Sequence, residues 1–200
     1  TEWELGSRVR AVMQAHRHVF VLCASTNIDR IATLAHCAPR GRPVICDGYQ
    51  KEILNCVEKL SGSKSGFYRF DRVIPYLAGN YKLRKWMEEA GFLSFVRVNR
   101  QFRAWMESYR GDGVLLYSMW EGYRSGPSSS HELAAFLEGF PVVSLHTSGH
   151  AQQETLRRVC RTVAPRRGIL PVHGEAPEVF RTLIPEARVV CLRDGESLTL

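Results

Sequence analysis

Short apolar runs alternate along this chain with amphipathic stretches, and this alternation constrains the fold more than any other feature of the sequence. The apolar run at 19–23 is followed by helical spacing over 28–37, and the run at 43–46 by helical spacing over 51–60. Buried strands that alternate with helices are typical of β-α-β units, whose strands lie parallel with helices on both faces of the sheet. The sequence therefore predicts an α/β fold built on a parallel sheet.

The same alternation continues to the C-terminus. Further strands are predicted over 92–98, 114–118, 141–145 and 168–172, and further helices over 81–90, 101–109, 132–138, 152–163 and 177–184. A hairpin is predicted over 189–200, around the turn at Asp194-Gly195-Glu196. The segment Ser25-Thr26-Asn27 is predicted to cap the helix at 28–37, and Ser130 to cap the helix at 132–138. Helical spacing predicts buried faces made by Ile53, Leu54, Val57 and Leu60 in one helix and by Leu156, Val159 and Val163 in another.

Composition and charge narrow the class of protein. The 200 residues are 44% hydrophobic, which is enough for a core, and no apolar run reaches the length of a membrane span. None of the six cysteines forms a C-x-x-C pair, and Cys23, Cys46 and Cys191 lie in apolar runs, so we expect buried, reduced thiols and a cytoplasmic location. The net charge of +7 favours a polyanionic partner such as nucleic acid without requiring one.

Two histidine segments follow predicted strands and carry the candidate chemistry. His146-Thr147-Ser148-Gly149-His150 lies between a strand and a helix, and His173 follows the next strand. A helix N-terminus presents free N–H groups to a phosphate, and glycine allows close approach of the backbone. Strand ends in open α/β sheets are where ligands bind. The pattern predicts a phosphate and metal site, although Thr147 or Ser148 acting only as a helix cap remains the plainer interpretation.

These segments resemble the C-terminal portion of the β-CASP metallo-β-lactamase-fold nucleases, the family of RNase J-type ribonucleases and of the pre-mRNA end-cleaving endonuclease. The resemblance covers nearly the whole chain and is carried by His146–Ala151, Pro165, Ile169–Glu175, Phe180, Asp194–Glu196, Cys23–Ile31, Gly41–Gln50 and Tyr117–Tyr123. It implies a β-CASP domain at 1–138, followed at 139–200 by the C-terminal segment of the metallo-β-lactamase αββα sandwich.

The resemblance also implies roles for individual residues. His150 matches a catalytic histidine that protonates the leaving oxygen or holds the scissile phosphate. His173 matches a metal ligand, and a histidine at this position is typical of RNA-directed members. The implied phosphate-binding residues are His146, Thr147, Ser148, Gly149 and Ser118, with Asn27 a further candidate for contact with the RNA backbone.

The chain departs from the family pattern in one respect. The H-x-H-x-D-H metal motif and the acidic motif that precede the β-CASP insert do not occur. His16 and His18 are two residues apart without a following Asp-His, and we expect both on the surface; Asp47 lies inside the insert. The chain is therefore expected to be the C-terminal half of a longer protein. Its missing N-terminal metallo-β-lactamase half would lie in the same or another chain and complete a site for two zinc ions.

Three functions stay open at this stage. The first is a part, inactive alone, of a zinc-dependent ribonuclease, the second a non-catalytic RNA-binding scaffold, and the third a hydrolase of a small phosphate or ester. A homodimer is also left open.

We expect Trp86, Trp105 and Trp120 to pack in the core or between domains, and Trp120 with Tyr123 is the better candidate for base stacking. Arginines 157, 158, 161, 166 and 167 predict a basic face that is either solvated or follows an RNA backbone.

Overall fold

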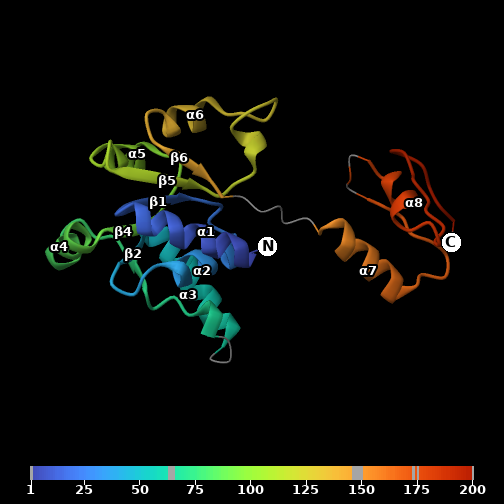
Figure 1. The fold of residues 1–200 in the computed structure, drawn as a ribbon, viewed down its shortest axis with the longest axis horizontal. Coiled ribbons are helices and arrows are strands. Elements are labelled where there is room, and N and C mark those ends of the chain that lie inside the picture. The colour runs from blue at the N-terminus through green and yellow to red at the C-terminus, as the bar shows by residue number, and fades with distance from the viewer. Residues whose placement is uncertain (1, 63–65, 146–150, 173, 175, 200) are drawn as a thin grey trace. The chain divides into compact units, whose positions relative to one another are not determined.

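The computed structural model describes residues 2–62, 66–145, 151–172, 174 and 176–199. The chain divides into two compact units, Thr1–Thr147 and Ser148–Leu200 (Figure 1). This division separates two compact units and does not test the predicted boundary at 138 between a β-CASP domain and a metallo-β-lactamase segment. That boundary stays a prediction.

A six-stranded sheet organises the first unit, and all its strand pairs are parallel (Figure 1). The strand order is β3-β2-β4-β1-β5-β6. The strands are β1 (His18–Leu22), β2 (Val44–Cys46), β3 (Val73–Pro75), β4 (Phe92–Val96), β5 (Gly113–Tyr117) and β6 (Val142–Ser144). The predicted α/β fold with a parallel sheet is confirmed. Strand β3 was not predicted, because it has three residues and ends in a proline, which sheets accept at an edge.

Helices cover both faces of this sheet. One apolar core joins it to α1 (Glu2–Ala15), α2 (Ile28–Cys37) and α3 (Gly48–Ser61), and a second core joins its other face to α4 (Tyr81–Ala90), α5 (Arg100–Glu107) and α6 (His131–Leu137). Along β1, Val19 and Val21 belong to the first core, while Phe20 and Leu22 belong to the second. Successive side chains of a strand point to opposite faces, so a strand buried on both sides must be apolar throughout.

Short-range signals fixed where the helices begin. Asn27 caps α2 by accepting from the backbone N–H of Arg30, and Ser130 caps α6 in the same way, as predicted. Asp47 caps α3. A side-chain oxygen at this position satisfies a backbone donor that has no partner inside the helix and stabilises it by about 1 kcal/mol. Asp47 directly follows the end of β2, so its cap also fixes the path of the chain leaving the sheet there.

Some predicted buried faces were wrong. In α3, Leu54 is buried but Leu60 is 88% exposed, because β2 and β3 have only three residues each and the helix extends past them. In the second unit, Val159 and Val163 of α7 (Gln153–Val163) are also exposed, at 50% and 67%.

The second unit contains less regular structure than predicted. Instead of a strand over 168–172, the described residues form a single parallel bridge between Ile169 and Val189. The hairpin over 189–200 is reduced to a turn, in which the N–H of Glu196 donates to the carbonyl of Arg193. Helix α8 (Val179–Leu183) is shorter than its predicted range. A strand is stable when it pairs in a sheet with a covered face, and the described part of this unit provides no such sheet for α7 to cover.

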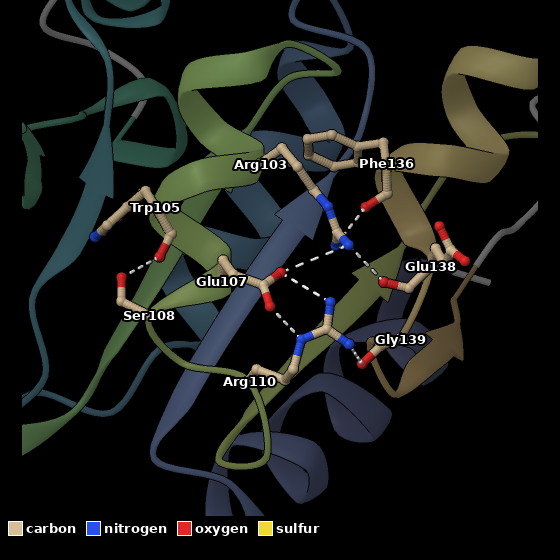
Figure 2. Close-up of polar contacts among 8 residues, drawn as sticks. All are labelled: Arg103, Trp105, Glu107, Ser108, Arg110, Phe136, Glu138 and Gly139. Carbon is tan, nitrogen blue, oxygen red and sulfur yellow. Dashed lines mark hydrogen bonds and ion pairs between the residues drawn. The ribbon is translucent and has the colours of Figure 1, made fainter.

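Two arginines of the α5 region fasten the end of α6 (Figure 2). Arg103 donates to the carbonyls of Phe136 and Glu138 at 3.2 and 2.8 Å, and Arg110 donates to the carbonyl of Gly139 at 3.3 Å. The last carbonyls of a helix have no partner within it, and cations stabilise them. Glu107 lies between the two guanidinium groups and forms ion pairs with both. This cluster directs the chain from α6 into β6.

The Glu107 cluster predicts a pH dependence of stability. The hydrogen bond from Arg110 and the charges of Arg110 and Arg103 hold the pKa of the Glu107 carboxyl below its ordinary value of 4.5. The interaction therefore stabilises the folded state above about pH 4.5, and this stabilisation is lost as the pH falls through the lowered pKa. We expect the melting temperature of the wild type to exceed that of Glu107→Gln at about pH 6 and to converge with it toward about pH 3.

A matched control separates this effect from a general loss of charge. Glu52 is exposed on α3, and Glu52→Gln should melt close to the wild type at every pH. A constant difference between the wild type and Glu107→Gln over the whole pH range would contradict the prediction.

Candidate functional site at the carboxyl edge of the sheet

Most of the predicted site lies outside the described residues. This applies to the predicted catalytic His150, to the predicted phosphate-binding residues His146, Thr147, Ser148 and Gly149, and to the predicted metal ligand His173. Ser118 and Asn27 are described. The site can therefore be built from the residues that precede and support the 146–150 segment.

The sheet brings distant parts of the chain to one edge. All six strands are parallel, so their carboxyl ends and the residues that follow them lie together. The chain leaves β1 toward α2 in one helical layer, whereas it leaves β5, a neighbour of β1, toward α6 in the other layer. Such a point of divergence is where open α/β sheets bind ligands. Leu145, the last described residue before 146–150, lies at this place, because its N–H donates to the carbonyl of Tyr117 at the end of β5.

A buried polar network holds this edge together. Nη1 of Arg30 donates to Oγ of Ser118 at 2.5 Å and to the carbonyl of Leu145 at 3.3 Å. The Ser118 hydroxyl donates to the same carbonyl at 2.8 Å, and its backbone N–H donates to the carbonyl of Leu22 at 2.9 Å. Arg30 and Ser118 are each 3% exposed. The network therefore joins the ends of β1, β5 and β6 directly before the 146–150 segment.

The guanidinium of Arg30 makes this edge electropositive. It comes from the first turn of α2, which Asn27 caps, and the hydrogen bonds to Ser118 and Leu145 compensate part of its lost hydration. Burial raises the pKa of the nearby Cys23 thiol to about 12, and the positive charge of Arg30 opposes that rise. The Cys23 thiol therefore stays protonated at neutral pH and is not a nucleophile. A buried fixed cation at a strand end suits an anionic ligand such as phosphate.

The structure assigns Ser118 a supporting position that the sequence did not show. The sequence motif indicated a serine at a strand end. It did not indicate that the serine hydroxyl would be buried between an arginine side chain and a backbone carbonyl. Arg30 was missed as part of this site, because in the sequence it is one more polar residue on a helix. Its partner Ser118 is 88 residues away. The signal that could have found it is its position in the first turn after a strand.

Among the described residues, no three histidine, cysteine, aspartate or glutamate side chains are close enough together to hold a metal ion. The side chains that the structure describes therefore do not fit a zinc ion. His18 lies at the amino end of β1, opposite the candidate site, and is 8% exposed, so its predicted surface position was wrong. Phe92 and Tyr109 cover its ring, and its Nδ1 lies 2.7 Å from Oδ2 of Asp112.

The predicted basic face of the second unit is smaller than the sequence indicated. Arg157 pairs with Glu154 and donates to the carbonyl of Leu183, and Arg161 pairs with Glu186. The remaining three arginines, Arg158, Arg166 and Arg167, are exposed and have no ion-pair partner within the described part of the chain. Arg166 and Arg167 border an apolar groove of about 630 Å³, whose walls include Ile169, Leu170, Val190, Leu192 and Leu198.

A family model of known proteins matches part of the chain. Residues 140–187 match the family model of the Zn-dependent metallo-hydrolase RNA specificity domain. The match supports a place in the metallo-β-lactamase superfamily for a chain with this α/β fold. It begins just before β6 and continues through the 146–150 segment, α7 and α8. None of the described helices is long and apolar enough to cross a bilayer.

A solved structure shares the fold. It is a protein of unknown function from Enterococcus faecalis V583, which is 18% identical and superposes with a TM-score of 0.67 over all of this chain. The chain spans 46% of the length of that protein. No curated protein matches the chain.

The Arg30–Ser118–Leu145 network predicts a cost for removing one hydroxyl. Ser118→Ala deletes a buried group that accepts from a charged donor, so we expect unfolding in urea to require about 1–2 kcal/mol less free energy. Ser108 is the matched control, because its hydroxyl is exposed and bonds the carbonyl of Trp105 within one helical turn. Ser108→Ala should change stability by less than about 0.5 kcal/mol. Equal effects of the two substitutions would argue against a buried network at this edge.

Proposed function

We propose that this chain is the substrate-binding part of a zinc-dependent, metallo-β-lactamase-fold ribonuclease of the β-CASP type. The observation that carries the proposal is the match of 140–187 to an RNA specificity domain, at the place where Arg30 and Ser118 support the chain entering 146–150. RNA is a chain of phosphodiesters, and a fixed cation at the strand end from which a glycine-containing, hydroxyl-bearing segment continues suits a phosphate.

The roles proposed for the individual residues follow from the resemblance. Thr147, Ser148 and Gly149 bind the phosphate together with His146, and His150 donates a proton to the leaving oxygen. Arg30 and Ser118 hold Leu145, the residue from which the chain enters this segment. His173 would be one ligand of zinc in the complete protein, and a zinc ion held there would supply Lewis-acid activation of a water molecule. The other metal ligands come from the N-terminal half, which this chain does not contain.

Three further features support a longer parent protein. The sequence has no H-x-H-x-D-H motif, and the chain spans about half of the solved structure that shares its fold. The exposed valines of α7 would be covered by an additional structural layer.

All six cysteines are free, as expected for the proposed cytoplasmic location. A non-catalytic RNA-binding module is the second candidate, favoured by the same missing motif.

Cleavage by the complete protein tests the catalytic proposal. We expect His150→Ala to lower the rate of RNA cleavage by about 10²- to 10⁴-fold, because a general acid contributes that much. His173→Ala should lower both the cleavage rate and the zinc content, measured by elemental analysis. His131→Ala is the control, since His131 is exposed at the start of α6 and should not matter. Full activity of His150→Ala and His173→Ala would contradict the assignment, and a complete protein that binds RNA without cleaving it would favour the non-catalytic module.

RNA binding by this chain alone can be tested through its salt dependence. Affinity should fall linearly on a double-logarithmic plot against salt concentration, because counterions leave the RNA. We expect Arg166→Ala and Arg167→Ala each to reduce the slope by about one, since each removes one phosphate contact. Arg161→Ala should leave the slope almost unchanged, because Arg161 is already paired with Glu186. A slope that none of the three substitutions changes would show that RNA does not follow this face.

A further inference from the structure

The segment after β5 exposes two aromatic rings at the carboxyl edge. Trp120 is 53% exposed and Tyr123 is 44% exposed, and their rings pack edge to face with centroids 5.3 Å apart. Trp120 therefore does not belong to the core of the first unit, whereas Trp105 packs against Phe20 and Phe92 there as predicted. Half-exposed tryptophan is costly to leave in water, and a fixed one commonly marks a binding surface.

The loop holds Trp120 in place. The indole lies directly against Gly122, where a Cβ atom would come within 2.4 Å of the ring, so only glycine fits beneath it. The Tyr117 hydroxyl donates to the carbonyl of Trp120 at 3.0 Å. Arg124 donates to Glu121 and to the Ser144 hydroxyl, which ties the loop to the end of β6. The exposed ring is therefore preorganised for binding, and preorganisation reduces the conformational entropy that is lost when a ligand binds.

A second exposed ring lies on the same edge. Tyr49, in the first turn after β2, is 55% exposed, and the Arg97 guanidinium lies 4.6 Å from its ring centroid. Arg97 follows β4 and is held by an ion pair with Asp47. A guanidinium fixed on a tyrosine ring forms a flat, cationic stacking surface. Strands β4 and β1 separate β2 from β5, so the strands that carry the two rings are about 14 Å apart.

We propose that single-stranded RNA crosses this carboxyl edge and stacks its bases on Trp120 and on the Tyr49–Arg97 pair. The inference rests on the proposed RNA-directed function and names the form of the substrate. Bases in a single strand expose their faces to aromatic rings, whereas the bases of a duplex are stacked on one another. The separation of the two surfaces fits a strand of several nucleotides. RNA is favoured as the ligand by the RNA specificity domain at 140–187, by the net charge of +7 and by the arginine next to Tyr49.

Binding measurements with aromatic substitutions test the proposal. The affinity of the chain for a fluorescein-labelled oligouridylate of roughly ten nucleotides is measured by fluorescence anisotropy. We expect Trp120→Ala and Tyr49→Ala each to weaken binding by about five- to thirty-fold, as for the loss of one stacked base. Trp120→Phe, which keeps a ring, should retain most of the affinity. Melting temperatures establish that each variant is folded.

Trp86→Ala is the matched control. Trp86 is also an exposed tryptophan, at 40%, but its indole N–H donates to the carbonyl of Gly41, which precedes β2 at the opposite edge of the sheet. Its removal should change RNA affinity by less than about two-fold.

The outcomes separate the inference from the function on which it rests. A folded wild-type chain that binds no RNA would overturn the proposed function. RNA binding that Trp120→Ala and Tyr49→Ala weaken no more than Trp86→Ala does would overturn the stacking surfaces and leave the RNA-directed function standing. Loss of affinity at only one of the two rings would overturn the path across the edge.

Discussion

Burial of the parallel sheet on both faces is the constraint on which the rest of the structure depends. Each connection between parallel strands must return to the same edge of the sheet, so all the carboxyl ends lie on one side of the first unit. This geometry places residues from the ends of β1, β5 and β6 within hydrogen-bonding distance. The network of Arg30, Ser118 and Leu145 and the two exposed aromatic surfaces lie at the same edge for the same reason.

The electrostatic character of this edge comes from a few fixed cations. Arg30 is buried beneath the site, while Arg97 and Arg124 are held at the surface by Asp47 and Glu121. Surface ion pairs contribute little to stability, but they fix where a guanidinium lies. The proposed RNA path therefore combines a buried positive charge for a phosphate with ordered rings for bases, and the two contributions can be separated experimentally by salt dependence and by aromatic substitution.

The second unit is less complete than the first. Helix α7 exposes Val159 and Val163, and the described residues of this unit form one isolated β-bridge instead of the predicted strands. An apolar helix face is stable when a sheet or another helix covers it. The proposed N-terminal half of a longer protein would provide such a cover, and the solved structure that shares the fold is about twice as long as this chain.

The sequence by itself determined the parallel α/β fold, the boundaries of α2, and the caps Asn27 and Ser130, because strand runs, helical spacing and caps act over a few residues. The histidine motifs that carried the family resemblance also fall inside the matched 140–187 segment. Only the tertiary structure decided that His18 is buried, that Leu60 and Val163 are exposed, and that Arg30 bonds Ser118 across 88 residues. Burial and long-range contacts depend on which elements become neighbours, and no local pattern in one sequence records that.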